Sequence, residues 1–439
     1  MQLPAGPWSF NLGYEYRKEL SSFTPNLNSQ NGVGRSAAIA LIPPSGYHTN
    51  EFSVETRVPI FSDDFNLGAP FFKHAEFTGS YRWVSNSLAG KNTAWSFGAN
   101  WEIVPGITLR GSKSQTFRAP AITELFLPLS TSFTTAADPC DKTRINSGPN
   151  PTSRAANCAA AFVALGLPAN YQLTSNVQSF TVQGLTGGNS ALKNEIASSW
   201  TYGFVLAPSF IPGFTLTADY VHIDLSKAIV NFSLASILST CYDSPVPPSA
   251  VCARFTRDNQ AQVTSFSSGF VNAGYTRFAG ESLTAAYTFD VNALPMVQTD
   301  SNAGRIGLNL RVFHTRRLQT SVSGTGFDLS DTEGTIGVAR WTGQFDFRYA
   351  RGPFKWSWTT HYIGESLFDR TFTGENRAQL TVAAYYLHDT VLAYDINKHF
   401  TARVGVNNVA DTAPPYPTTG IGVYDQIGRF WFVGVNAKY

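Results

Sequence analysis

The sequence predicts an all-β fold, an antiparallel transmembrane β-barrel portion of about 14 strands. Many segments alternate apolar and polar residues with a period of two, as strands between lipid and water do. Charged residues make up only 14% of the chain, against roughly 25% in soluble proteins. No run of about 18 apolar residues occurs, which excludes a membrane-spanning helix.

The N-terminal part of the chain begins this series of strands. In the first segment, residues 8–17, Trp8 and Tyr14 lie on one face, and Ser9 and Glu15 lie on the other. Aromatic or aliphatic residues alternate with polar ones in the same way in residues 51–60, 71–85, 95–103 and 107–115. Each of these segments is therefore predicted to be a strand with one lipid-facing side.

The C-terminal part supplies the remaining strands. They are predicted at residues 196–207, 214–225, within 266–289, 305–314, 335–349, 354–363, 381–396, 400–408 and 429–439. In the last of them Trp431 and Val433 alternate with Phe432 and Gly434, and the chain stops on the aromatic residue Tyr439. An alternating strand of this kind suits a barrel better than the exposed edge of a soluble sheet.

Connection lengths divide into two groups. Short turns are predicted at residues 104–106, 208–213, 351–353 and 397–399, and intermediate ones at 61–70 and 291–303. Most other connections are longer and polar, above all residues 120–195 and 226–264. Short periplasmic turns and long extracellular loops are typical of an outer-membrane barrel. The two longest loops are the predicted outer ligand surface, because long loops often carry function.

Charged residues on the polar faces are predicted to line the lumen. The candidates for contact with a ligand are Glu55, Arg57, Glu76, Arg82 and Glu102. The same five residues could equally form a solvated charge network inside the barrel, and this structural reading is favoured. Neither reading identifies a ligand.

The four cysteines fall as two local pairs, each within one of the longest loops. Four cysteines allow three pairings, and the sequence neighbours are the expected partners: Cys140 with Cys158, and Cys241 with Cys252. Disulfides of this kind indicate an oxidising compartment. Zinc is the competing reading, but the sequence has no CxxC motif and no histidine near either pair. No metal site is predicted.

Motifs for other functions are missing. The sequence has no HExxH, P-loop, GxGxxG or GxSxG motif, so neither an enzyme nor a cofactor site is predicted. A net charge of +2 gives no reason to expect a nucleic-acid partner. Residues 1–7 lack the basic and apolar regions of a signal peptide.

Several segments together resemble one family, the TonB-dependent outer-membrane receptors, and in particular their C-terminal barrel. The similar segments are LPAGP with GYEYR at residues 3–17, LRGSKSQTFRAP with ELF at 109–126, GNSALKNE at 188–195, VNNVAD with PP at 406–415, and YD with GR at 424–429. Ser190 and Asn194 stand where the family usually has proline. Local cysteine pairs also occur in an alphaproteobacterial branch of this family.

The motif residues are interpreted as architecture more readily than as ligand contacts. They are Phe117, Arg118, Ala119, Pro120, Glu124, Asn189, Leu192, Glu195, Asn408, Asp411, Gly428, Arg429 and Tyr439. Pro120 would end a strand, Arg118 and Glu124 would hold the base of a loop, and Gly428 with Arg429 would start the last strand.

The resemblance implies uptake of a large, scarce solute across the Gram-negative outer membrane, of the siderophore, cobalamin or oligosaccharide class. Family members place a plug inside a 22-stranded barrel and respond to TonB through an N-terminal box. With about 14 strands, residues 1–439 are therefore expected to be a C-terminal barrel portion without plug or TonB box. Outer-membrane lipid is the expected surrounding partner, and the TonB complex would act only on the full-length receptor.

Two other functions stay open. A self-contained passive porin of about 14 strands is compatible with the even strand number. A soluble surface-binding β-protein is the third reading, and it would stay soluble without detergent. The receptor-like segments favour the first reading over both.

Overall fold

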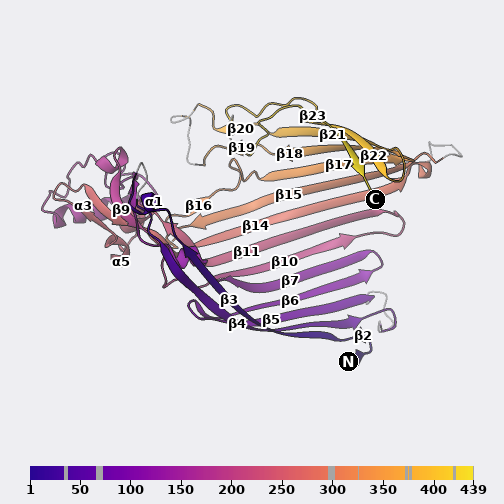
Figure 1. Ribbon diagram of the computed structural model, residues 1–439, viewed down its shortest axis with the longest axis horizontal. Helices are drawn as coiled ribbons and strands as arrows, with labels where there is room; N and C mark the ends of the chain where they lie inside the picture. The colour runs from indigo at the N-terminus through magenta and orange to yellow at the C-terminus, as the bar shows by residue number, and fades with distance from the viewer. Residues whose placement is uncertain are drawn as a thin grey trace.

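A 15-stranded antiparallel sheet forms most of the protein (Figure 1). The computed structural model describes residues 1–438 except 34–37, 66–72, 295–301, 325, 371–373, 375–377 and 419–421. Fourteen strands follow one continuous path, β23-β22-β21-β18-β17-β15-β14-β11-β10-β7-β6-β5-β4-β3, and β16 pairs with β15 beside it. This agrees with the strand number that the alternation predicts.

Four of the five long N-terminal strands, β3, β4, β6 and β7, extend further than the sequence pattern indicates, and β5 covers most of its predicted range. The five strands are β3 (Ser9–Phe23), β4 (Ile42–Phe61), β5 (His74–Asn86), β6 (Gly90–Val104) and β7 (Ile107–Arg118), preceded by the small pair β1 (Gln2–Leu3) and β2 (Gly6–Pro7). The prediction of a polar connection up to residue 50 is wrong, because only the short helix α1 (Leu27–Gln30) and its flanks separate β3 from β4. Phe23 pairs with Ile42 at the far end of this hairpin. Apolar alternation ends where the strands leave the lipid, but backbone pairing continues.

The central strands are β10 (Glu195–Leu206), β11 (Phe214–Phe232), β14 (Gly269–Asp290), β15 (Arg305–Ser321) and the short β16 (Ser330–Asp331). The 3₁₀ turn η2 (Val291–Ala293) follows β14. The register between β11 and β14 shifts near Ala228, next to Lys227, whose φ is 54°. Beyond this irregularity β11 continues to Phe232, past the predicted end at residue 225.

The C-terminal strands are β17 (Trp341–Arg351), β18 (Phe354–Ile363), β21 (Tyr385–Asp395), β22 (Phe400–Asn407) and β23 (Phe430–Ala437). The predicted strand at 335–349 begins only at Trp341, because residues before it form a turn in which Gly337 has a φ of 88°. The predicted strand at 381–396 is interrupted, since β20 (Thr381–Val382) pairs instead with β19 (Ser366–Leu367). Tyr439 lies outside the described residues.

The connections separate to the two ends of the sheet as predicted (Figure 1). The turns at 105–106, 208–213, 352–353 and 396–399 lie at one end, and the longest connections lie at the other. One connection at the loop end, residues 87–89 between β5 and β6, is short. Large parts of the predicted intermediate turns at 61–70 and 291–303 lie outside the described residues.

The two longest loops fold into a compact α/β unit, which corrects the prediction of polar loops. We call residues 128–186 and 233–268 the loop cap. The first segment contains β8 (Ser130–Thr134), α3 (Pro151–Ala164), η1 (Asn176–Gln178) and β9 (Val182–Thr186); α2 (Ile122–Phe126) precedes it. The second contains α4 (Leu234–Asp243), α5 (Ser249–Cys252), β12 (Phe255–Arg257) and β13 (Val263–Ser267). The strands form one sheet in the order β12-β13-β9-β8, in which β9 and β13 are parallel.

Burial differs between the two parts of the protein. The main hydrophobic cluster lies in the loop cap, where Phe162, Leu173 and Leu238 are at most 1% exposed. Large apolar side chains on the outer face of the main sheet, such as Tyr81 and Phe97, are about half exposed in the isolated chain. Such exposure suits a face that contacts lipid. No helix among the described residues is long and apolar enough to cross a membrane.

Candidate ligand-binding surface

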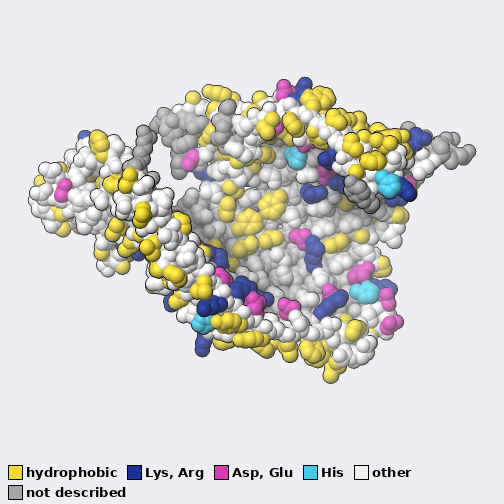
Figure 2. Space-filling model, viewed as in Figure 1, with side chains coloured by type: hydrophobic (Ala, Val, Ile, Leu, Met, Phe, Trp, Pro, Cys, Tyr) yellow, Lys and Arg dark blue, Asp and Glu magenta, His cyan; other side chains and the backbone are white. Residues whose placement is uncertain are grey.

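The concave face of the main sheet carries the predicted lumen-facing charges. Figure 2 shows this hollowed face, with cationic and anionic side chains over its inner surface. Glu76 on β5 accepts hydrogen bonds from Arg57 Nε on β4 (2.7 Å) and from Asn100 Nδ2 on β6 (3.0 Å). The three side chains share this face because strand residues two apart, and paired residues on neighbouring strands, point the same way.

Three of the five lumen candidates surround one polar pocket. Arg57, Glu76 and Glu102 line a pocket of about 420 Å³ near the turn end of the sheet, together with His74 and Thr108. The charged side chains of this pocket already have partners within the protein. Arg57 Nη2 lies 2.5 Å from Glu76 Oε2, and Glu102 accepts the N–H of the turn residue Gly106. These contacts support the charge-network interpretation for this pocket.

The other two candidates lie further toward the loop end. Arg82 pairs with Glu51, with Nη1 and Oε2 3.2 Å apart. Glu55 and Arg82 line a second polar pocket of about 260 Å³. The backbone of Glu55 belongs to the β4 ladder, but within the described part of the chain its carboxylate forms neither a hydrogen bond nor an ion pair. Its carboxylate is the free anionic group among the five candidates.

A further ion pair on this face was missed by sequence reasoning. Arg110 on β7 and Asp219 on β11 form a bidentate pair, 2.7 and 2.5 Å long, although β10 runs between them. Gly203 is the residue of β10 that pairs with both of them in register. A Cβ at Gly203 would lie 2.3 Å from Asp219 Oδ1, so the glycine allows the two side chains to meet over the strand. A sequence signal for this pair existed: β10 has a glycine at a lumen-facing position, and the two strands beside it carry opposite charges at the paired positions.

This geometry predicts that Gly203→Ala destabilises the barrel. The added methyl group would collide with Asp219 and with the carbonyl of Ala218, and we expect a loss of about 1–3 kcal/mol in the free energy of unfolding. Urea unfolding in detergent, followed by tryptophan fluorescence, measures it. Gly111→Ala is the matched control, because its Cβ would meet only Thr201 O at 3.5 Å. Equal effects of the two substitutions would contradict the proposed contact.

Arg118 ties the end of β7 to the base of the first long loop. Its Nη1 and Nη2 contact the Glu124 carboxylate in α2 at 2.9 and 3.0 Å, and its Nε contacts Glu195 at 2.5 Å. Glu195 starts β10, is 7% exposed, and also accepts the N–H of Ile229 at 2.6 Å. Glu124 in turn accepts the N–H of Ala121 at the start of α2. The arrangement clamps strand, helix and returning strand together.

The neighbouring motif residues have contacts of the same architectural kind. Phe117 is in β7, Ala119 and Pro120 connect it to α2, and Asn189 and Leu192 lead into β10. Asn189 accepts the N–H of Ala191 and donates Nδ2 to Phe270 O. Leu192 is 1% exposed. Asn194, at a usual proline position of the family, is buried, and its amide has no partner among the described residues.

The C-terminal motif residues organise the connection between β22 and β23. Asn408 is fully buried with a φ of 52°; its Oδ1 accepts the N–H of Thr412, and its Nδ2 donates to Thr412 O. Asp411 accepts the N–H of Arg429 at 2.9 Å. Gly428 has a φ of 79°, so it can turn the chain into the last strand without strain.

Both predicted disulfides are present, and each closes a loop within one segment of the cap. They join Cys140 to Cys158 and Cys241 to Cys252. Helix α3 begins after Asn150, whose side chain accepts the N–H of Ser153, and Pro151 occupies its first turn. The disulfides therefore order each segment, but they do not join one segment to the other.

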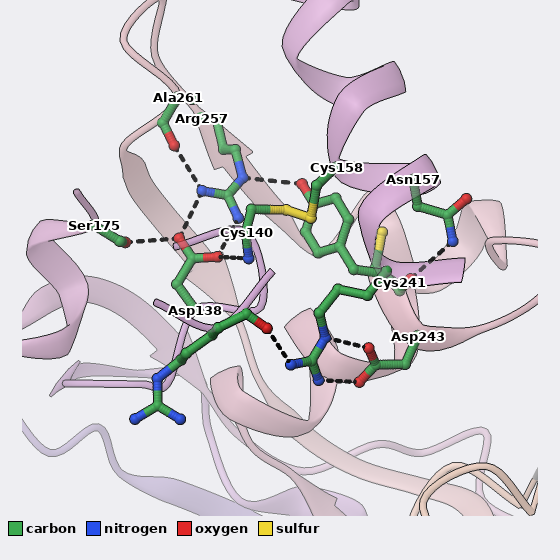
Figure 3. The surroundings of a disulfide bond; sticks show 12 residues. Asp138, Cys140, Asn157, Cys158, Ser175, Cys241, Asp243, Arg257 and Ala261 are labelled. Atoms are coloured by element: carbon green, nitrogen blue, oxygen red, sulfur yellow. Dashed lines mark hydrogen bonds and ion pairs between the residues drawn. A yellow bond between two sulfur atoms is a disulfide. The ribbon is translucent and has the colours of Figure 1, made fainter. Parts of the chain in front are cut away.

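Two buried ion pairs join the segments (Figure 3). Arg154 on α3 contacts Asp243 on α4 through Nε (2.5 Å) and Nη2 (2.7 Å), with side chains 8% and 0% exposed. Arg257 on β12 contacts Asp138 in the first segment through two bonds of 2.8 Å, with side chains 4% and 0% exposed. Each segment thus supplies one arginine and one aspartate.

Further bonds surround the Arg257 pair. Asp138 also accepts the Ser175 hydroxyl at 2.7 Å and the Cys140 N–H at 3.0 Å. Arg257 Nε donates to the Tyr242 hydroxyl at 2.9 Å, and the guanidinium carbon lies 5.2 Å from the Tyr242 ring centre. Burial acts to lower the pKa of Arg257, but the pair with Asp138 outweighs it and holds that pKa above its usual value. Burial raises the pKa of Tyr242.

A mostly apolar pocket opens beside these contacts. It has a volume of about 320 Å³ between α3 and the α4–α5 region, and Ala161, Leu165, Pro247 and Phe255 contribute to its walls. Asn157 also lines this pocket, but its side-chain amide already donates hydrogen bonds to the carbonyls of Tyr242 and Ser244. Among the described residues no cluster of histidine, cysteine and carboxylate side chains could hold a metal ion.

Comparison with known proteins gives one family match and several similar structures. The family model for the TonB dependent receptor-like β-barrel matches residues 1–409. It describes the barrel alone, which agrees with the expectation that this stretch contains no plug. The search of curated proteins found no match.

Solved structures share the fold at low sequence identity. The siderophore receptor PirA from Acinetobacter baumannii aligns with a TM-score of 0.62 and 13% identity, over 100% of this chain and 53% of that one. A mutant ferric enterobactin receptor from Pseudomonas aeruginosa gives 0.58 and 15%, over 98% and 51%. The FrpB iron transporter from Neisseria meningitidis gives 0.52 and 14%, over 98% and 52%. The chain spans about half the length of these structures.

Proposed function

The chain belongs to the TonB-dependent receptor-like β-barrel family, and we propose that residues 1–439 are the C-terminal barrel portion of a receptor that takes up a large, scarce solute. The family consists of outer-membrane transporters and receptors of Gram-negative bacteria, not enzymes, and the chain is an outer-membrane protein. The solute is of the siderophore, cobalamin or oligosaccharide class.

The observation that carries this proposal is the loop cap. A loop that only connects two strands needs no core, yet here two segments share buried side chains, two disulfides and two buried ion pairs. A rigid surface at the loop end loses less conformational freedom on binding a ligand than flexible loops do. The cap is therefore suited to first contact with an external solute, beside the charged concave face.

The edges of the main sheet support the proposed barrel portion. Among the described residues, β3 pairs only with β4, and β23 pairs only with β22. A transmembrane sheet must be closed, because unpaired backbone groups in lipid cost several kcal/mol each. Additional strands of a longer receptor would pair with these two edges. The plug and the TonB box would belong to the same additional part, and the TonB complex would act through them.

The test is uptake by cells that lack other receptors of this kind. The full-length receptor is expected to import at least one labelled solute from a panel of ferric siderophores, cobalamin and maltooligosaccharides, and deletion of TonB should abolish that uptake. Residues 1–439 expressed alone should show no TonB-dependent uptake, because the responding elements would be missing.

Three outcomes would count against the proposal. TonB-dependent uptake by residues 1–439 alone would refute the barrel-portion assignment. Stable conductance of this chain in planar bilayers, without TonB, would favour the passive porin. A chain that stays soluble and monodisperse without detergent would be a surface-binding β-protein.

A further inference from the structure

The outer face of β14 and β15 carries a group of three arginines, Arg277, Arg316 and Arg317, here called the outer arginine cluster. A register shift creates it. Gly280 pairs with Thr315, and Ala279 pairs with Arg317, so Arg316 is an extra residue between two paired positions. Bulges of this kind re-aim side chains. Arg316 and Arg317 are consecutive in the sequence, and both are exposed.

Register places these arginines on the lipid side of the sheet. Ala279 and Arg277 lie two and four residues before Glu281 on one strand, so the three share a face. Their face also contains Leu283, which lies next to Tyr202 and Phe204 in a groove on the outside of the barrel. Arg317 pairs with Ala279, whose small side chain leaves room, and is a diagonal neighbour of Arg277.

The cluster lies at the border between apolar and charged surface. On β15 the outward residues nearer the turn end are Ile306, Leu308, Leu310 and Val312, followed by His314 and the two arginines. His314 stacks on Trp341 with ring centres 4.1 Å apart. Aromatic residues concentrate where a barrel leaves the hydrocarbon layer. The arginines are therefore at the depth of lipid headgroups on the loop side.

An outer groove runs into this border. It has a volume of about 460 Å³, and its apolar part is formed by Tyr202, Phe204, Ala218, Tyr220, Leu283 and Val312. At its other end the lining changes to Glu281, His314 and Arg316. A molecule that fills the groove would need one apolar portion and one polar end.

The charges favour an anionic polar end. Glu281 lies 3.2 Å from Arg316 and 2.7 Å from His314, and Asp224 lies 3.6 Å from Arg277. These acids hold two of the arginines, while Arg317 has no ion-pair partner in the described part of the chain. Arg277 and Arg316 remain 51% and 66% exposed. Guanidinium groups bind phosphate oxygens well.

We propose that this surface docks a phosphate-bearing lipid of the surrounding membrane. The phosphate contacts the outer arginine cluster, and an acyl chain lies in the groove between Tyr202 and Val312. The site is separate from the loop cap and from the concave face. Bound lipid would also cover the outward residues of four neighbouring strands, β10, β11, β14 and β15.

The experiment compares two lipids that differ in headgroup. Pyrene-labelled phosphatidic acid and pyrene-labelled phosphatidylcholine are titrated into the full chain in uncharged detergent, and energy transfer from tryptophan reports binding. Phosphatidic acid should bind about 10–100-fold tighter, since each arginine near a headgroup contributes about a factor of five. R277Q/R316Q/R317Q should remove this preference.

The matched control removes three arginines from the concave face, R305Q/R348Q/R403Q, and should keep the preference. Arg317→Gln alone serves if the triple variant misfolds, and it should reduce the preference several-fold. Equal affinity of the unaltered chain for both lipids would overturn the proposal. So would a preference that survives in R317Q and in the triple variant, or one that the control variant loses equally.

Discussion

Asp243→Asn is expected to destabilise the loop cap by about 3–5 kcal/mol, because it leaves the buried Arg154 guanidinium without its counter-charge. Asp243 is fully buried and also accepts the Ser239 hydroxyl at 2.6 Å, so its carboxylate organises two groups. Hydrogen exchange of α3 and α4 in the full chain measures the effect. Their exchange should accelerate by a factor of about 10²–10⁴ while the main sheet is unchanged.

Two controls distinguish the effect of breaking the buried Arg154–Asp243 pair from the effect of removing any negative charge. Asp290→Asn removes the same charge from the exposed pair with Arg305, whose side chains are 62% and 65% exposed, and should cost less than about 1 kcal/mol. Replacing both partners, Arg154→Met with Asp243→Leu, should recover most of the stability, because no unpaired charge remains buried. If Asp243→Asn leaves α3 and α4 as protected as before, the pair does not hold the segments together.

The sequence predicted the main sheet well because its strands face two different environments. Period-two alternation exists only where one side of a strand contacts lipid and the other contacts a polar interior. Where β4 extends beyond the lipid, residues 42–50 show no such contrast, and the strand was missed. Backbone pairing with β3 continues there regardless of side-chain type. The strand portions that sequence reasoning missed are thus those whose two faces do not contact different environments, so that apolar and polar residues do not alternate there.

The loop cap could not be predicted for a different reason. Its disulfides join near neighbours in sequence, 18 and 11 residues apart, and were predicted correctly. Its ion pairs join residues 89 and 119 positions apart, and no local pattern marks such partners. Asn150-Pro151 before the alanine-rich stretch of α3 was a usable helix signal.

The concave face shows the same limit. Charged residues could be assigned to the lumen by alternation, but their partners depend on register between strands. Arg57 meets Glu76 because β4 and β5 bring them close, and Arg110 meets Asp219 only because Gly203 lies between them. Register follows from pairing along the whole strand, which one segment of sequence does not contain.

Removing either disulfide is expected to cost the cap about 3 kcal/mol, because each closes a loop of similar length in the unfolded segment. Cys140→Ala with Cys158→Ala, and Cys241→Ala with Cys252→Ala, are the two variants. Hydrogen exchange of α3 and α4 again provides the measurement. Unchanged exchange in both variants would mean that the core and ion pairs alone order the segments.

The rate at which the native disulfides are reduced should show whether the buried ion pairs keep the cap closed. Cys140 and Cys158 are at most 1% exposed, whereas Cys241 is 5% exposed and Cys252 is only partly buried. A thiolate reductant must reach a sulfur atom, so Cys140–Cys158 can be reduced only when the cap opens, and Cys241–Cys252 should be reduced sooner.

Opening of the cap requires separation of the segments that Arg154 and Asp243 join. Dithiothreitol should therefore reduce Cys140–Cys158 about 10²–10⁴ times faster in Asp243→Asn, with alkylation and mass spectrometry as the readout. An unchanged rate would show that the sulfur atoms become accessible by a local motion that leaves the ion pair intact.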